Sequence, residues 1–200
     1  MLLHDKLKSY TLILASQSPR RRELLTGSGL EYQLAAKYQV EELFPSDMPV
    51  YQVAEYLSQL KSEGYPEKLG EGDILLTADT VVIVGSEILG KPHSREEACQ
   101  MLRKLSGATH TVVTGVTLRT ATRRHSFSAE SAVRFRTLTD EEICYYVDNF
   151  RPFDKAGSYG IQEWIGYVAI EGIEGSFYNV MGLPIQRLYV ELDEFINKTR

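Results

Sequence analysis

The chain has 200 residues, of which 43% are hydrophobic, and its formal net charge is −5. That length suffices for one sizeable core, and we predict a single domain over residues 1–200. The negative charge argues against an extended nucleic-acid surface, because duplex binding normally shows as a basic patch. No apolar run approaches the roughly 18 residues that a membrane span needs, and the N-terminal apolar run is too short for a signal peptide. We therefore expect a cytoplasmic protein with no nucleic-acid or membrane partner.

The first third of the chain is predicted to hold a strand and two helices. Residues 11–15 form a short apolar run that indicates a buried strand. Ser18 suits the N-cap, and Pro19 the first position, of a helix that follows directly. Residues 31–50 indicate a strand and then a loop. A second helix ends near Gly64, and its apolar residues share one face: Val53, Ala54, Leu57 and Leu60.

The middle of the chain is predicted to begin with a hairpin. Residues 74–84 are almost wholly apolar and indicate a central strand. Gly85-Ser86 suits a two-residue hairpin loop, after which residues 87–91 run back. Capping boxes that start at Ser94 and Thr139 each predict the beginning of a helix.

Two more strands, over residues 111–120 and 132–138, are predicted on either side of a polar turn that contains Arg123, Arg124 and His125. A long loop covers residues 154–162, and a closing helix follows Leu183-Pro184. Strands and helices mixed in this way predict an α/β fold, with a mixed twisted sheet and flanking helices.

Three consecutive arginines, Arg20, Arg21 and Arg22, stand in the first turn of the helix that begins at Pro19. Each positive charge lies at the positive end of the helix dipole, which costs roughly 0.3–1 kcal/mol. An anion bound there would satisfy both the charges and the free backbone N–H groups, and guanidinium groups match phosphate oxygens. Alternatively, the arginines form a solvated face or pair with acidic residues. One helix cannot direct all three the same way, so at least one is expected to be structural.

Asp79 lies in the middle of the apolar strand over residues 74–84. A buried carboxylate costs several kcal/mol unless it is paired or binds a metal. In the predicted hairpin register Asp79 faces Pro92, and Lys91 lies one residue away, so a break in the ladder at Pro92 could bring Lys91 to Asp79. The alternatives are that Asp79 caps a backbone turn or reaches solvent at the end of a strand.

A carboxylate pair, Glu41-Glu42, lies in a predicted loop and could join Asp79 in an all-oxygen site for Mg²⁺ or Mn²⁺. The four histidines show no ligand spacing, which argues against zinc. Cys99 and Cys144 fall in predicted helices and are interpreted as small buried hydrophobes rather than a disulfide. The sequence contains neither the Walker pattern of P-loop enzymes nor the Gly-x-Ser-x-Gly motif of the usual hydrolase elbow, so it predicts neither class.

Several distinctive blocks follow one another along the chain: Leu14-Ala15-Ser16-Gln17-Ser18-Pro19-Arg20-Arg21, Ala78-Asp79-Thr80-Val81-Val82, Gly90-Lys91-Pro92, Met101-Leu102-Arg103-Lys104-Leu105-Ser106-Gly107, Asp154-Lys155-Ala156-Gly157-Ser158-Tyr159-Gly160-Ile161-Gln162 and Val180-Met181-Gly182-Leu183-Pro184. In this order they resemble the Maf family of nucleotide pyrophosphatases, over about residues 12–192. The resemblance implies a fold like that of the inosine triphosphate pyrophosphatases, with two lobes around a central cleft. It also implies a possible homodimer and a role in nucleotide-pool sanitation.

The resemblance implies metal-dependent cleavage of a nucleoside triphosphate to the monophosphate and pyrophosphate. Asp79 corresponds to the catalytic proton acceptor and Glu42 to its metal-linked partner, although Val40 stands where an acidic residue is common, which leaves Glu41 open as the alternative. Lys61 and Lys91 correspond to basic residues beside the phosphates; Ser62 follows Lys61 where alanine is usual. Ser16, Arg20, Arg21, Thr80 and Gln162 correspond to substrate-binding positions.

Two short motifs imply the branch of the family that acts on dTTP and UTP: Ala78-Asp79-Thr80 and Tyr159-Gly160-Ile161-Gln162. Two other functions are weighed against this one. A nucleotide-binding regulator of cell division without catalysis would have no need of a buried, metal-directed carboxylate. Nucleic-acid binding through Arg119, Arg123, Arg124 and Arg134 conflicts with the acidic balance and the lack of a basic stripe.

Overall fold

The computed structural model describes residues 1–198, which divide into two compact units. The first unit contains Met1–Asp79, Thr114–Ala129 and the chain from Gly182 onward; the second contains Thr80–Val113 and Glu130–Met181. Two lobes around a central cleft, as the resemblance implies, stay a prediction. Within residues 1–198, no helix has both the length and the apolar character needed to cross a bilayer. A single domain over residues 1–200 stays a prediction.

A mixed sheet forms the centre of the fold, in the order β2-β1-β3-β5-β6-β7, with β4 paired to β3. β1 is parallel to β2 and β3, whereas β4 is antiparallel to β3 and β7 is antiparallel to β6. The strands are β1 (Thr11–Leu14), β2 (Gln33–Leu34), β3 (Asp73–Val84), β4 (Glu87–Leu89), β5 (Thr109–Arg119), β6 (Arg124–Phe135) and β7 (Ile170–Glu174). The predicted α/β class with a mixed sheet and flanking helices is confirmed.

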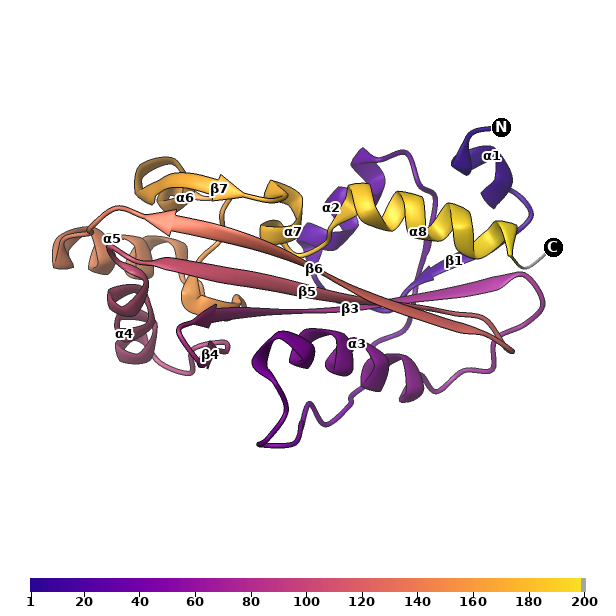
Figure 1. Ribbon diagram of the computed structural model, residues 1–200, viewed down its shortest axis with the longest axis horizontal. Coiled ribbons are helices and arrows are strands. Elements are labelled where there is room, and N and C mark those ends of the chain that lie inside the picture. Colours follow the sequence, from indigo (N-terminus) through magenta and orange to yellow (C-terminus); the bar gives the residue numbers. More distant parts are fainter. Residues whose placement is uncertain (199–200) are drawn as a thin grey trace. The chain divides into compact units, whose positions relative to one another are not determined.

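The longer helices of the first unit begin where the local sequence predicts. The helical elements of this unit are α1 (Leu3–Leu7), α2 (Pro19–Gly27), the 3-10 turn η1 (Val50–Gln52), α3 (Val53–Glu63) and α8 (Ile185–Asn197). Pro19 opens α2 because the first helical position needs no backbone N–H. In α8, the spacing of Leu188, Leu192 and Phe195 puts three buried side chains on one face. Figure 1 shows α1 beside the C-terminal part of α8.

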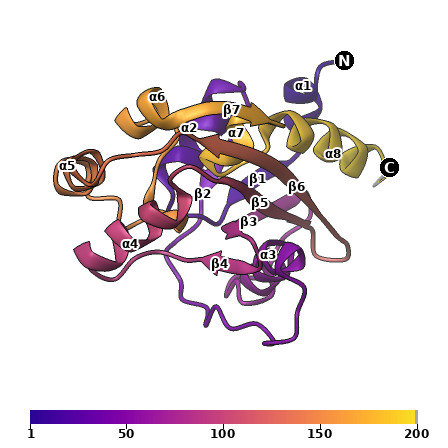
Figure 2. The ribbon, with the colours of Figure 1, turned by 60° about the vertical axis from the view of Figure 1, so that its left-hand side comes forward.

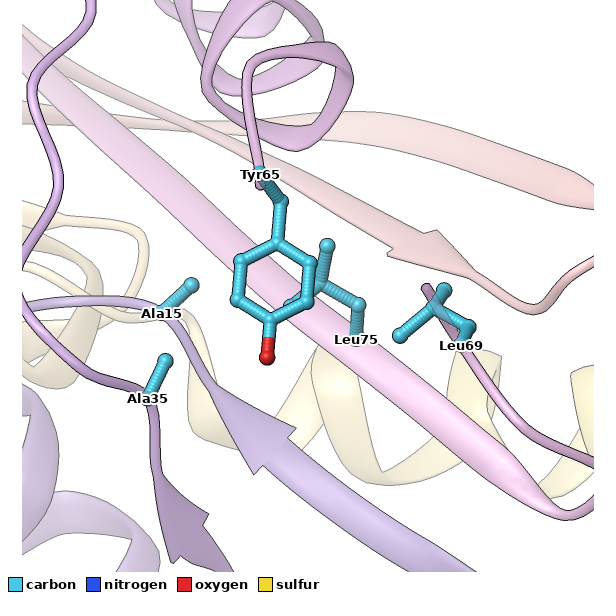
Figure 3. Packing of buried hydrophobic residues seen from close by; sticks show 5 residues of the cluster. All are labelled: Ala15, Ala35, Tyr65, Leu69 and Leu75. Carbon is cyan, nitrogen blue, oxygen red and sulfur yellow. The ribbon is translucent and has the colours of Figure 1, made fainter. Parts of the chain in front are cut away.

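A small apolar cluster joins four segments of the first unit. It contains Ala15, Ala35, Tyr65, Leu69 and Leu75, all at least nine-tenths buried. Figure 3 shows the Tyr65 ring among these side chains, with the two alanines on one side and Leu69 on the other. The cluster therefore holds the chain after β1, after β2 and after α3 against β3, and these are the segments that carry several of the predicted site residues.

The second unit has two long helices and several short ones. They are α4 (Arg95–Leu105), α5 (Asp140–Phe150), the 3-10 turn η2 (Ala156–Ser158), α6 (Trp164–Ala169) and α7 (Phe177–Met181). Figures 1 and 2 both show α4 and α5 side by side. Thr139 forms a complete capping box with Glu142 at the start of α5. Ser94 accepts from the N–H of Glu97 at the start of α4, but the Glu97 carboxylate binds the N–H of His93 instead of that of Ser94.

Several local predictions need correction. β6 begins at Arg124, eight residues before the predicted start, so the turn covers residues 120–123. Its polar residues alternate with buried ones, and this hid the strand. Ser18 is the N-cap of α2, but its side chain makes no capping hydrogen bond. The hairpin of β3 and β4 has the predicted register, with Val82 opposite Leu89, but the ladder ends there. The sequence also gave no signal for the short elements α1, α6, β7 and α7.

Candidate functional site

Three charged side chains of the first unit meet around the end of α3. The ammonium of Lys61 donates to Asp79 Oδ1 in a short contact and lies 3.1 Å from Glu42 Oε1. Asp79 and Lys61 are largely removed from solvent, whereas Glu42 is half-exposed. The structure therefore brings together three of the predicted catalytic residues, and Lys61 supplies the charge that a buried aspartate requires.

The position of Lys61 opposite Asp79 follows from how α3 packs on the sheet. The hydroxyl of Thr77, two residues before Asp79, donates to the carbonyl of Ser58 at 2.7 Å. The Ser58 hydroxyl is in turn 2.8 Å from that of Thr117 on β5. These bonds are buried, so they fix the last turn of α3 against β3 and leave Lys61 one turn beyond Ser58 at the level of Asp79.

Glu42 reaches the site from a loop that is attached to the C-terminal end of α3. The hydroxyl of Tyr38 donates to the carbonyl of Lys61 at 2.7 Å, and its ring packs edge-on against Tyr65. A side chain at Gly64 would lie only 2.6 Å from Val40, so Val40 packs directly on that glycine. Of the two glutamates that the sequence left open, Glu42 is the one that pairs with Lys61.

Arg21 is buried and its guanidinium is bonded to three parts of the first unit. Nε donates to the carbonyl of Gly182 at 2.7 Å, and Nη1 donates to the carbonyl of Ala78 at 2.8 Å and to Ser16 Oγ at 3.1 Å. Burial lowers the pKa of this guanidinium, while the nearby Asp79 carboxylate acts in the opposite direction. Arg21 therefore holds the backbone next to Asp79, and it fits the expectation that one of the three arginines is structural. Arg20 is half-buried.

The second unit carries three more of the predicted residues, Thr80, Lys91 and Gln162. The N–H of Gly157 donates to the carbonyl of Gly90 at 3.0 Å, so the loop after α5 fixes the residue that precedes Lys91. Gly157 has a φ of 67°, and a side chain there would lie 2.9 Å from Val82. Gln162 Oε1 is buried and has no hydrogen-bond partner among residues 1–198. The roles of these three residues, and the predicted contact of Lys91 with Asp79, stay predictions.

A second set of ionic side chains in this unit was not singled out from the sequence. Lys155 is buried and lies 3.0 Å from Glu163, whose carboxylate also accepts a short hydrogen bond from Tyr146. Lys155 does occur in one of the quoted blocks, Asp154-Lys155-Ala156-Gly157. The sequence gave no signal that Glu163 and Tyr146 would meet it, because Tyr146 reads as an ordinary core residue of an amphipathic helix.

The predicted divalent cation can be tested against the donor set of Asp79 and Glu42. Both carboxylates contact the same ammonium, so both have an oxygen within reach of a single cation. Mg²⁺ is commonly held by one or two carboxylates together with waters and substrate phosphates. Within residues 1–198 no group of three or more His, Cys, Asp or Glu side chains could hold a metal. The two carboxylates therefore fit a cation that takes its remaining ligands from a phosphate substrate and water.

The family model and the similar proteins of known name agree with one another. The model of the family described as Maf-like protein matches residues 11–195. A dTTP/UTP pyrophosphatase of Porphyromonas gingivalis is 53% identical over 193 residues, which cover 96% of this chain and 97% of the relative. A dTTP/UTP pyrophosphatase of Bacteroides thetaiotaomicron is 50% identical, over 93% and 96% of the two chains.

More distant proteins are similar over equally long stretches. A dTTP/UTP pyrophosphatase of Flavobacterium johnsoniae is 40% identical, over 98% of this chain and the whole of the relative. Among solved structures, a HAM1 protein from Coxiella burnetii covers 92% of this chain and 99% of its own, with a TM-score of 0.48 and 13% identity. The match of the family model over nearly the whole chain, together with relatives at 40–53% identity, shows that the chain belongs to the Maf-like family.

Proposed function

We propose that this protein hydrolyses dTTP and UTP to the nucleoside monophosphate and pyrophosphate. The observation that carries the proposal is the cluster of Asp79, Lys61 and Glu42, in which a largely buried carboxylate lies beside an ammonium and a second carboxylate. The names of the relatives, dTTP/UTP pyrophosphatase, support the substrate and the reaction. Family membership supports the transfer of that activity to this chain, because the identity extends over 96% of its length.

In the proposed reaction Asp79 accepts a proton from a water molecule. The water oxygen forms a bond to the α-phosphorus as the bond from that phosphorus to the bridging oxygen breaks, and pyrophosphate leaves with that oxygen. Proton acceptance by a positioned carboxylate typically contributes 10²- to 10⁴-fold to such a rate. Arg20, Lys61 and Lys91 would bind the phosphate oxygens and stabilise the charge that develops on them. Arg21 would hold the Ser16 hydroxyl and the backbone carbonyl of Ala78 in place.

A divalent cation, Mg²⁺ or Mn²⁺, is part of this proposal. Asp79 and Glu42 would hold it, and when bound it would neutralise charge on the triphosphate. In the absence of substrate, Lys61 provides positive charge at the same two carboxylates. Substrate binding would then bring the phosphate oxygens that complete the donor set of the cation.

Selection of the base is proposed to depend on Gln162, with Thr80 and Arg20 in supporting positions. The Gln162 carboxamide oxygen is buried and accepts no hydrogen bond from residues 1–198, so it requires a donor. Thymine and uracil carry a donor at N3 and an acceptor at O4, which match a carboxamide. Cytosine has an acceptor at N3 and a donor at its 4-amino group, so in the same orientation of the carboxamide it would leave the glutamine oxygen unpaired. This supports a preference for dTTP and UTP over CTP.

We also propose a cellular location and an oligomeric state for the enzyme. A location in the cytoplasm agrees with the sequence, and a homodimer is proposed from the resemblance to the family. The main alternative function is a regulator that binds nucleotides without cleaving them. That alternative leaves the Asp79–Lys61–Glu42 cluster without a role, since binding alone does not require a carboxylate among the groups that face a triphosphate.

The test is to measure pyrophosphate release from dTTP, UTP, CTP, GTP, dITP and 7-methyl-GTP, with and without Mg²⁺ or Mn²⁺. Metal-dependent release that is fastest for dTTP and UTP is the expected result. Release led by a purine nucleotide would keep the reaction and refute the role of Gln162. Nucleotide binding without release from any substrate would refute the proposed enzyme and favour the regulator.

A further inference from the structure

Gln162 lies in a tight turn that is closed at both ends by side chains of one buried network. The turn runs from Gly160 to Glu163, and the N–H of Glu163 donates to the carbonyl of Gly160 at 3.0 Å. The N–H of Gly160 donates to the hydroxyl of Tyr146 at 3.0 Å, and the same hydroxyl donates to the Glu163 carboxylate. One phenol group therefore binds the residue two before Gln162 and the residue directly after it.

Lys155 completes this network from the other side of the turn. Its ammonium lies 3.0 Å from Glu163 and 2.7 Å from Asp154, and the lysine is buried. A side chain at Gly160 would lie 2.9 Å from the Glu163 carboxyl carbon and 3.0 Å from Lys155 Cε, so a larger residue there would displace the ends of these two side chains. Burial and the neighbouring Glu163 carboxylate raise the pKa of Tyr146, so the phenol keeps its proton and remains a donor.

The chain that leaves the turn is fixed as closely as the chain that enters it. The N–H of Gly166, in the first turns of α6, donates to the carbonyl of Glu163 at 2.9 Å. A side chain at Gly166 would collide with the carbonyl of Ile161, which lies against α6. The backbone on both sides of Gln162 thus has defined partners, whereas the buried oxygen of the Gln162 side chain has none among the described residues.

We propose that Tyr146, Glu163 and Lys155 are positioning residues for substrate selection, which hold the Gly160–Glu163 turn so that the Gln162 carboxamide meets the edge of a pyrimidine base. This inference rests on the proposed function. None of the three residues needs to touch the nucleotide. Their effect is to keep the hydrogen-bonding direction of Gln162 fixed, since a misplacement of about 1 Å at such a contact can cost up to 10²-fold in rate.

The substitution that tests the network is Tyr146→Phe, which removes only the hydroxyl and keeps the buried ring. Tyr145→Phe is the matched control, because Tyr145 precedes Tyr146 on α5 but is half-exposed and packs against Trp164 and Phe150. Glu163→Gln is a second test, since it keeps the size of the side chain and removes the charge that pairs with Lys155. The measurement is kcat/KM for UTP and for CTP in each variant.

We expect Tyr146→Phe and Glu163→Gln to lower kcat/KM for UTP about tenfold and to change kcat/KM for CTP less than twofold, while Tyr145→Phe changes neither. The ratio of the two kcat/KM values does not depend on how much of the enzyme is folded, so a loss of stability cannot imitate this result. An equal fall for both nucleotides would show a merely structural network and overturn the inference.

The activity of the parent enzyme on UTP and CTP distinguishes a failure of this inference from a failure of the proposed function. A parent that does not release pyrophosphate from UTP, or does not prefer UTP to CTP, would refute the proposed function. A parent that prefers UTP, with the same preference retained in both Tyr146→Phe and Glu163→Gln, would refute the positioning role alone.

Discussion

Two lysines of this protein each lie between two carboxylates, one in each unit of the chain, and their surroundings differ. Lys61 meets Asp79 and Glu42, which come from separate segments, and the Glu42 side chain is 45% exposed. Lys155 is only 9% exposed and meets Asp154, its neighbour in sequence, and Glu163. The Glu163 carboxylate has a further partner in Tyr146.

The comparison teaches that the same pairing of charges can serve two purposes. Around Lys61 the charges converge from different segments and one carboxylate stays in contact with water, so a substrate or cation can join them. Around Lys155 the Asp154 carboxylate is also exposed, at 58%, but Glu163 is only 20% exposed. Glu163 binds the ammonium and a phenol that holds the backbone of a turn, so this side of the network is closed. The arrangement around Lys61 suits a catalytic site. The arrangement around Lys155 suits a network that holds the turn between Gly160 and Glu163 in place.

Asp79→Asn should have the largest effect, and it tests directly whether the cluster around Lys61 is catalytic. We expect turnover of dTTP and UTP to fall about 10³-fold, because an amide cannot accept the proton of the attacking water. Nucleotide affinity, measured by calorimetric titration, should stay within a few fold. Near-normal turnover in this variant would refute the assignment of Asp79 as proton acceptor. Glu163→Gln is the matched control from the closed network, where the expected loss of turnover is no more than about tenfold.

Lys155→Met should give the largest loss of stability. It leaves the Glu163 carboxylate, which is largely buried, without its ammonium partner, and we expect a loss of about 3 kcal/mol in the free energy of unfolding. Urea unfolding followed by fluorescence measures this loss. A change below about 0.5 kcal/mol would show that the network around Lys155 is not closed, and the comparison with Lys61 would fail.

Acid should weaken the second unit through His110, which is buried and bonded at Nε2 to the hydroxyl of Tyr159 at 2.7 Å. Burial lowers the pKa of His110 from 6.5 to about 4. The unfolded chain therefore binds the additional proton first, so stability from this group is present above pH 6.5 and is lost as the pH falls toward 4. The loss amounts to about 1 kcal/mol by pH 5.5 and to at most about 3 kcal/mol at pH 4.

His110→Gln removes this titration and keeps a polar partner for Tyr159. Urea unfolding of the parent and the variant between pH 4 and pH 7 should show that the parent loses more stability than the variant on acidification. Parallel curves for the two proteins would contradict the prediction. Other groups also titrate in this range, but they contribute equally to both proteins.

The smallest effect is expected for Lys104→Met, which breaks an ion pair with Glu87 in which both side chains are about half-exposed. Exposed pairs of this kind contribute about 0–1 kcal/mol, so the free energy of unfolding should change by no more than about 0.5 kcal/mol. A loss as large as that of Lys155→Met would mean that burial is not what distinguishes the ion pairs of this protein.

The sequence predicted the longer elements because their signals are local. Pro19 and Thr139 mark helix starts, and the apolar residues of β3 and α8 show strand and helix periods directly. The hairpin register at Gly85-Ser86 followed from the loop length alone. β6 was predicted too short because its first half mixes polar with buried residues. The short elements α6, α7 and β7 have too few residues to show a period.

For the candidate site, too, some features follow from the sequence and others only from the tertiary structure. The sequence by itself determined that Asp79 is a carboxylate within an apolar strand and therefore needs a partner, because burial of a charge is costly wherever it occurs. It also determined, through motifs, the family and the residue types at the site. Only the tertiary structure decided that Lys61 is that partner, that Glu42 rather than Glu41 joins it, and that Arg21 binds the backbone of Ala78 and Gly182. These contacts join residues far apart in the chain, and their geometry depends on how α3 and α2 pack on the sheet, which no local pattern of residues encodes.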